Sequence, residues 1–487
     1  MQKFKDIKFY NAAWIIVMII SFPLILIPMG VSVYRYILQP ILVAVGVLLL
    51  VTPIFKRQPV LYLKSQLFLL LFLISYAVAI LLNLSGGMRT IALNVFELAA
   101  CGILFLVVLN GAFRKKREDL YEDLLLYSRI IAVILFIGAL ISLIMFFTLF
   151  SHRLTVDFGA FDLDIIRFRF VGLGVGRLFG VYSDPNWGSF LGVCAIIFSI
   201  LPFFLRPLGK FEKTFYIVNI IVQYMYIILS DSRSGLLTLS AFAFVFSVFL
   251  LYRYVKISKH SLAWCVSIAI AVLPAVFVFM INPVMQNALM NFNRLIPRPT
   301  AYESYTNLLE VSTATVGRDF TEVHDITTGR LDIWRDALSL ARINPVIGIT
   351  RGNIPIEAAA INPGGFVARG IALHNAFLDL IVSSGIIGTL LMCAFFIRPI
   401  KKTVIYVFSK GHNDMVVAML LSFTVAAVTF SMLGSGIFIN LNFTTVLFWL
   451  LLGYMLRFTM CDEDFVEFTA LDFLQQLRKK IITKKQD

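Results

Sequence analysis

The sequence predicts an all-α polytopic membrane protein of about twelve transmembrane helices, because apolar runs of about 20 residues recur along it. Hydrophobic residues make up 59% of the 487 residues and charged residues only 14%, whereas soluble domains are about half apolar and about a quarter charged. Basic residues fall in alternate connections between the apolar runs, as the positive-inside rule requires. The three observations together exclude a soluble globular protein.

The predicted spans follow from apolar composition, and their bounds are approximate. They lie near residues 13–31, 36–54, 66–84, 91–112, 125–150, 188–205, 213–230, 235–252, 261–281, 375–398, 413–433 and 436–457. The first has a basic start without a small-residue cleavage site, so we expect it to be an uncleaved span. Residues 1–281 then hold spans one to nine, 282–373 a large, partly helical extracytoplasmic loop, 374–457 the last three spans and 458–487 a cytoplasmic tail.

Lysine and arginine divide between the two predicted faces of the membrane. Every lysine lies in a segment predicted to be cytoplasmic, and none occurs between Lys259 and Lys401, a stretch that contains many arginines. This alternation puts both termini in the cytoplasm and explains the net charge of +14 without nucleic-acid binding. An outer face rich in guanidinium groups suits phosphate or carboxylate, which arginine binds through a bidentate fork.

Two further segments have a predictable local structure. In the large loop, residues 330–342 place Leu331, Trp334, Leu338 and Ala341 at steps of three and four, which predicts a helix with one apolar stripe. In the tail, residues 462–480 carry apolar side chains at helical spacing before a lysine-rich end, which predicts a basic amphipathic helix on the anionic inner leaflet. The five cysteines are scattered and predict neither a disulfide framework nor a metal site.

A first polar cluster lies at the outer boundary before the sixth span. It contains Arg177 and ends in Asp184-Pro185-Asn186. The segment is either a plain turn or an anion site, because the start of the next helix would present unpaired backbone N–H groups.

A second cluster, residues 230–235, is the whole connection between the seventh and eighth spans. In one interpretation Asp231 and Arg233 neutralise each other while Ser234 caps the next helix. In the other, Arg233 binds a phosphate at the level of the lipid headgroups.

Two more clusters flank the large loop. Arg330 follows Gly329 at the start of the predicted loop helix, where a cation opposes the helix macrodipole and so does not stabilise the helix. His374 and Asn375 open the tenth span. A histidine in that place is either a polar end-cap or a group that can accept a proton near pH 7.

Taken in chain order, the four clusters resemble the signature of the O-antigen ligase and polymerase superfamily of bacterial membrane enzymes. The family pattern is an arginine-glycine element ending in Pro-Asn, a serine-rich turn with arginine, Gly-Arg-x-x-x-Trp with a later Pro-x-x-Gly, and His-Asn with a later Gly-x-x-Gly. The matching residues are Arg177, Gly180, Pro185, Asn186, Ser230, Ser232, Arg233, Ser234, Gly329, Arg330, Trp334, Pro345, Gly348, His374, Asn375, Gly385 and Gly388.

The resemblance implies glycosyl transfer from an undecaprenyl-diphosphate-linked oligosaccharide, without metal, nucleotide sugar or other cofactor. It places the active site on the outer face of the bacterial cytoplasmic (inner) membrane. Arg330 and His374 would be catalytic, and Arg177 and Arg233 would be further contacts to the diphosphate. Asn186, Ser232 and Asn375 complete the expected substrate-binding set. Direct displacement would invert the anomeric centre with His374 as base, and Asp231 is the alternative base.

Three functions stay open at this stage. We favour a polysaccharide polymerase, which extends a lipid-linked acceptor sugar, because polymerases are the commoner and more diverged members. The alternative is a ligase that transfers the finished glycan to lipid A-core or another surface acceptor. The expected partners are the acceptor glycan, the bilayer and a chain-length regulator protein. A flippase is the third candidate, but it should line a path with charges, and only Glu97, Arg129 and Asp379 come near the spans.

Overall fold

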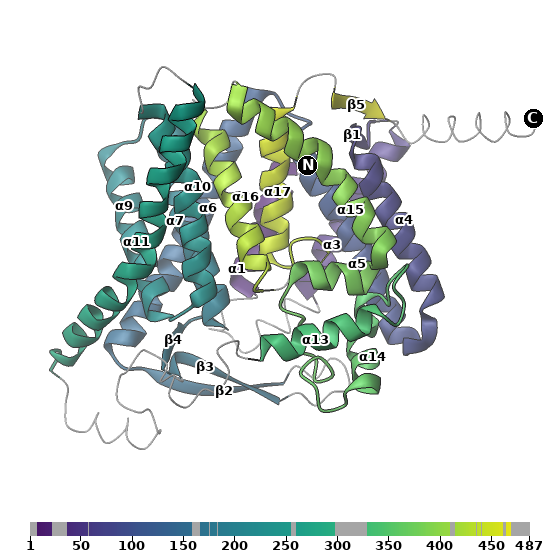
Figure 1. Ribbon diagram of the computed structural model, residues 1–487, viewed down its shortest axis with the longest axis horizontal. Coiled ribbons are helices and arrows are strands. Elements are labelled where there is room, and N and C mark those ends of the chain that lie inside the picture. Colours follow the sequence, from purple (N-terminus) through teal and green to yellow (C-terminus); the bar gives the residue numbers. More distant parts are fainter. Residues whose placement is uncertain are drawn as a thin grey trace, which may run out of the picture.

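The computed structural model is mostly helical, with two small β-sheets at opposite ends of a helix bundle (Figure 1). It describes residues 7–21, 37–56, 58–157, 166–174, 176–182, 184–254, 260–297, 329–409, 414–434, 436–439, 441–460 and 464–468. Buried apolar side chains from nearly all bundle helices form one continuous core.

Each predicted span overlaps a helix of the bundle. In chain order the helices are α1 (Ile7–Ser21), α3 (Gln39–Phe55), α4 (Gln66–Leu82), α5 (Gly87–Ile103, continued by a π-helical turn Leu104–Val108 and a 3₁₀ turn Leu109–Gly111), α6 (Arg117–Phe147), α7 (Pro185–Ile200), α8 (Pro202–Leu205), α9 (Lys210–Leu229), α10 (Arg233–Tyr254), α11 (His260–Arg294), α15 (Ala376–Ser409), α16 (Met415–Ser431) and α17 (Phe443–Thr459). Among the described residues, 6 helices are long and apolar enough to cross a membrane. The chain is therefore a multi-pass membrane protein, and the number of spans stays a prediction.

One end of the bundle carries a sheet where the sequence predicts a helix. Strand β1 (Leu61–Leu63) pairs antiparallel with β5 (Phe465–Phe468), so the first part of the expected amphipathic tail helix is wrong. The carboxylate of Asp464 explains why the chain is held there, because it forms ion pairs with Arg398 and with Lys402, the latter at 3.2 Å. Residues 469–487 lie outside the described residues.

The opposite end carries a second sheet, of strands β2 (Ser151–Asp157), β3 (Ile166–Gly174) and β4 (Arg177–Gly180). These strands form an antiparallel meander in the connection before α7. Figure 1 shows this sheet at the same end of the bundle as the helices of the large loop. Two segments far apart in sequence therefore cover one end of the molecule.

Helix α11 continues to Arg294, past residue 281, where the ninth span was predicted to end, and the bounds of the large loop stay a prediction. Its described part contains α13 (Arg330–Ala341), the 3₁₀ turn η6 (Arg351–Asn353) and α14 (Ile354–Ile361). The predicted helix over residues 330–342 is confirmed, and its predicted stripe is half right: Trp334 and Ala341 pack against the loop core, but Leu331 and Leu338 are more than half exposed. Ile333, Ala337 and Leu340, which have the same spacing, fill the loop's own core.

The loop docks on a break in α15, at two glycines of the sequence pattern. Gly385 has φ 62° and interrupts the helix. The backbone N–H groups of Ile386 and Ile387 then donate to the carbonyls of Pro345 and Val346, at 2.9 and 3.1 Å. An unpaired peptide group is costly within a membrane, and the loop carbonyls supply the hydrogen-bond acceptors that the broken helix does not provide. These two bonds hold the loop on the bundle at this point.

We predict that Gly348→Ala and Gly385→Ala each weaken this docking. An added Cβ at either glycine would lie 2.5 Å from backbone atoms of the facing segment, and both residues have positive φ. The left-handed conformation alone costs about 1–2 kcal/mol for an alanine. The measurement is the thermal unfolding midpoint in detergent, together with the rate at which a protease cuts the loop.

Gly364→Ala is the matched control for that experiment. It lies in the same loop, and an added Cβ there meets no atom within 4 Å. Equal midpoints and cleavage rates in all three variants would contradict the docking role of the two glycines.

Candidate functional site

The structure brings the first two predicted clusters together into one hydrogen-bonded group. Arg177, at the start of β4, donates from Nε to the carbonyl of Ser230 at 2.8 Å and from Nη2 to Oδ1 of Asn186 at 2.9 Å. The hydroxyl of Ser232 donates to the same Asn186 oxygen at 2.9 Å. Strand β4, the start of α7 and the turn between α9 and α10 therefore meet at these three side chains.

Two backbone caps in this group differ from the predictions. The N–H groups at the start of α7 are not left for an external anion, because Oδ1 of Asp184 accepts from the backbone of Asn186 and Trp187, at 2.7 and 3.3 Å. The predicted anion site at that helix start is therefore filled by the chain's own carboxylate. The cap of α10 is Ser232, which accepts from the N–H of Gly235 at 3.1 Å, and not Ser234.

These bonds give Arg177, Asn186 and Ser232 a structural role. The two lone pairs of the Asn186 oxygen are engaged by Arg177 and Ser232. We infer that the three residues position the turn, while the exposed side chain of Arg233 follows it at the first residue of α10. A direct bond from any of them to a substrate stays a prediction.

The backbone is left-handed at both residues predicted as bases. Asp231 has φ 46° and His374 has φ 50°, and Thr350, which precedes Arg351, has φ 59°. A non-glycine residue in this region costs energy and persists where the surroundings impose it, often at functional sites. Asp231 lies in a hydrogen-bonded turn, where its N–H donates to the carbonyl of Ile228 at 3.2 Å, and His374 lies in a bend just before α15.

The loop residues Arg330 and His374 are held by a common small core. Ile333 lies on the first turn of α13 after Arg330, and Leu373 precedes His374; both belong to the loop core that α15 completes through Val382. Asn375 caps α15, since its Oδ1 accepts from the N–H groups of Phe377 and Leu378, at 2.9 and 3.2 Å. This capping accounts for Asn375 without a ligand.

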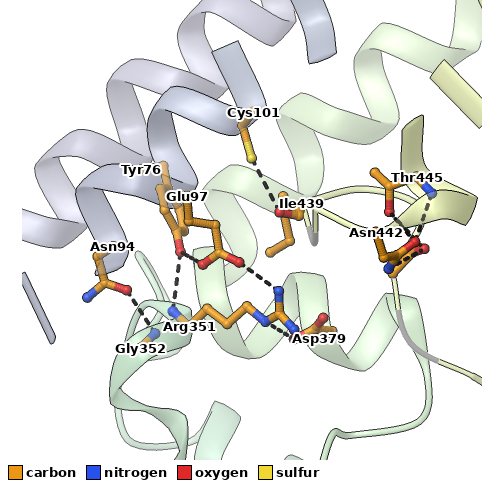
Figure 2. Close-up of polar contacts among 11 residues, drawn as sticks. Tyr76, Asn94, Glu97, Cys101, Arg351, Gly352, Asp379, Ile439, Asn442 and Thr445 are labelled. Atoms are coloured by element: carbon orange, nitrogen blue, oxygen red, sulfur yellow. Dashed lines mark hydrogen bonds and ion pairs between the residues drawn. The ribbon is translucent and has the colours of Figure 1, made fainter. Parts of the chain in front are cut away.

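A charged network that the sequence did not reveal anchors the loop to the bundle (Figure 2). Arg351 of η6 donates from Nη1 to Oε1 of Glu97 on α5 at 2.7 Å, and its Nε lies 3.8 Å from Oδ1 of Asp379 on α15. The side chain of Arg351 is 25% exposed, whereas those of Glu97 and Asp379 are 14% and 4% exposed. Burial lowers the pKa of Arg351, but the charges of Glu97 and Asp379 outweigh it and raise that pKa above its usual value.

Polar side chains of α4 and α5 complete the network. The hydroxyl of Tyr76 donates to Oε2 of Glu97 at 3.3 Å and accepts from the backbone N–H of Arg351 at 3.2 Å. The carboxamide of Asn94 donates to the hydroxyl of Thr350 and accepts from the N–H of Gly352, at 2.9 and 2.8 Å. The loop segment around Arg351 is thus bonded to two helices that lie about 250 residues earlier in the chain.

The signal for this network was present in the sequence. A carboxylate inside a span needs a cation or a water-filled cavity, and Glu97 and Asp379 both lie inside predicted spans. Nothing in their spacing identified Arg351 among the outer arginines as the partner.

Several outer arginines are therefore already engaged by the protein itself. Arg351 pairs with the two buried carboxylates, and Arg335 pairs with Asp332 on the surface of α13 at 3.0 Å. Arg369 lies over the ring of Phe366, 5.0 Å from its centroid, and donates to the carbonyl of Gly365. Arg233 and Arg330 are the first residues of α10 and α13, where a cation opposes the helix macrodipole.

Comparison with known proteins agrees with the resemblance seen in the sequence. Residues 218–393 match the family model described as O-antigen ligase. The matched segment runs from α9 to α15, and so includes the turn at Arg233, the large loop, His374 and the broken helix. No curated protein matches the chain closely enough to count as a relative.

We predict that Arg351→Met strongly destabilises the attachment of the loop. Removal of the guanidinium leaves Glu97 and Asp379 as unpaired buried charges, which typically costs about 3–5 kcal/mol. The triple variant Arg351→Met, Glu97→Gln, Asp379→Asn should recover part of that loss, because no buried charge remains. The thermal unfolding midpoint in detergent measures both effects.

Arg335→Met is the control for this prediction. Its ion pair with Asp332 is exposed on both sides, with side chains 78% and 62% accessible, so its loss should cost at most about 1 kcal/mol. If Arg351→Met lowered the midpoint no more than Arg335→Met, the anchoring role of the network would be wrong.

Proposed function

We propose that this membrane protein is a glycosyltransferase that uses an undecaprenyl-diphosphate-linked oligosaccharide, because residues 218–393 match the family model described as O-antigen ligase. The reaction takes place at the end of the bundle that carries the large loop and the sheet β2–β3–β4. That end faces the outside of the bacterial cytoplasmic membrane, and both termini are cytoplasmic.

One observation above all supports this proposal. The turn that carries Arg233 is held by side-chain bonds from β4 and α7, and the loop that carries Arg330 and His374 is anchored by a buried charged network. Both of these rigid structures lie at the same end of the bundle (Figure 1). An anionic headgroup held there would meet fixed guanidinium groups, which is the condition for electrostatic stabilisation of a leaving group.

The chemistry then follows from the leaving group. The acceptor hydroxyl attacks the anomeric carbon, the bond from that carbon to the diphosphate oxygen breaks, and the lipid diphosphate departs with the electron pair. Arg233 and Arg330 stabilise the negative charge on the departing oxygens, since arginine keeps its proton at any relevant pH. His374 accepts the proton of the attacking hydroxyl, and the anomeric configuration inverts. Asp231 is the alternative base. No metal and no cofactor takes part in these steps.

We favour polymerase activity, in which the acceptor is the next lipid-linked repeat unit of an O-antigen, capsule or exopolysaccharide. In the alternative, a ligase, the acceptor is lipid A-core or another surface molecule. The two activities share every step above and differ only in the acceptor. A chain-length regulator protein is an expected partner of the polymerase.

We predict that Arg233→Ala, Arg330→Ala and His374→Ala each abolish long glycan chains in a host that makes the polysaccharide. Loss of one electrostatic donor slows such a reaction by about 10²–10³, and loss of a general base slows it by about 10²–10⁴. Arg335→Ala, on the same helix as Arg330, should keep the normal chain length. Gel profiles of the surface glycan, with immunodetection of protein in the membrane fraction, make the measurement; normal chains in all three variants would refute the enzyme assignment.

We predict that a deletion strain separates polymerase from ligase. Loss of a polymerase leaves single repeat units attached to their acceptor, because transfer to the acceptor still operates. Loss of a ligase leaves long chains on the lipid carrier. Mass analysis of the lipid-linked and surface-attached glycans distinguishes the two. If neither product is found and lipid-linked repeat units are no longer transported, the result would favour a flippase.

A further inference from the structure

The outer part of α11 carries buried carboxamides on the side that faces the bundle. Asn282 and Gln286 are one turn apart and are 8% and 9% exposed, and Asn293 is 2% exposed. Neighbouring residues on the other side, such as Val284 at 64%, are exposed. Asn282 lies 18 residues, or five helical turns, after Trp264. Pro274 lies inside α11 between these two residues, so the buried side at Asn282 is given by its own low exposure and not by the stacking of Trp264 on Tyr252 of α10.

Two of these carboxamides have unused hydrogen-bonding atoms. Within the part of the chain that the structure describes, Oδ1 of Asn282 and Nε2 of Gln286 are buried without a partner. By contrast, Nδ2 of Asn293 donates to the carbonyl of Phe146 at 3.2 Å. An unsatisfied buried amide is unfavourable, and leucine or methionine would fill the same volume without that cost. The polarity at residues 282 and 286 is therefore not explained by packing.

The position of these residues along the helices relates them to the predicted diphosphate site. α10 and α11 run antiparallel, and the hydroxyl of Ser240 on α10 donates to the carbonyl of Ala275 on α11 at 3.0 Å. Seven residues farther toward the loop end, α10 reaches Arg233 and α11 reaches Asn282. Gln286 lies one turn beyond, on the part of α11 that continues past the end of α10 (Figure 1). Asn282 thus lies at the height of the arginine proposed to bind the diphosphate.

We propose that Asn282 and Gln286 form a sugar-binding subsite, in which their carboxamides hydrogen-bond hydroxyl groups of the saccharide attached to that diphosphate. The subsite rests on the proposed function. The available atoms are one acceptor and one donor, which matches a hydroxyl because it can both give and accept a hydrogen bond. A phosphate offers acceptors only, so it would leave the Asn282 oxygen unpaired. Binding of sugar removes the cost of both buried amides, and this gives the site selectivity for a hydroxylated ligand over lipid chains.

The test replaces the carboxamides by apolar side chains of similar size, Asn282→Leu and Gln286→Met, in the full-length protein. The probe is the lipid-linked saccharide extracted from cells that lack the protein, and the readout is the rate of transfer in membrane vesicles. We expect each variant to raise KM about tenfold, as for loss of one hydrogen bond, with kcat little changed. The thermal unfolding midpoint should stay equal or rise, because an unsatisfied polar group has been removed.

Ser267→Ala is the matched control. Ser267 lies on the same helix, is fully buried and has an unpartnered hydroxyl among the described residues, but it is 15 residues, roughly 22 Å, from Asn282 toward the other end of the bundle. Its replacement should leave KM unchanged. If the Leu and Met variants failed to accumulate, Asn282→Ala and Gln286→Ala would replace them with the same expected rise in KM.

Arg233→Ala in the same assay separates the two levels of the proposal. Loss of transfer in Arg233→Ala with wild-type KM in the variants of Asn282 and Gln286 overturns the subsite and leaves the proposed function standing. Wild-type transfer in Arg233→Ala overturns the proposed function, and the subsite with it.

Discussion

The ion pairs of Arg351 with Glu97 and Asp379 are the constraint on which the rest of the outer structure depends. They tie a polar loop to helices through side chains that are largely buried, where the attraction between charges is stronger than in bulk water. A buried charged group is costly unless it is paired, so detachment of the loop would leave two carboxylates exposed to an apolar bundle. Pairing of all three charges therefore favours one docked position of the loop.

The docking of the loop also explains why the sequence pattern contains uncharged residues such as glycine and proline. Gly348 and Gly385 permit two backbones to approach each other, and Pro345 supplies a carbonyl to the broken helix α15. Asn375 caps the same helix at its start. The pattern thus includes residues that join the loop to the bundle.

Features that depend on residues close in the sequence could be predicted, and features that depend on residues far apart in the sequence could not. The helices were predictable because about 20 apolar residues suffice to identify a span, whatever its neighbours are. The helix over residues 330–342 was predictable, but its buried side was not, because Leu331 and Ile333 fit equally well until α15 is placed beside them. The strand at Phe465 depends on Leu63, and the partner of Glu97 lies 254 residues away. No local pattern contains such pairings.

The arginines of the segments predicted to face outward meet two different structural requirements. At Arg351 the guanidinium meets two carboxylates from different helices, and a planar fork with five donors can do this where an ammonium group would reach one. At Arg233 and Arg330 the same fork suits the oxygens of a diphosphate. Replacement by lysine should therefore be tolerated at neither kind of position, but for different reasons: loss of loop attachment at Arg351, and loss of transfer in a fully attached loop at the other two. Charge alone does not account for the bias, because lysine would supply it equally; the geometry of the guanidinium does.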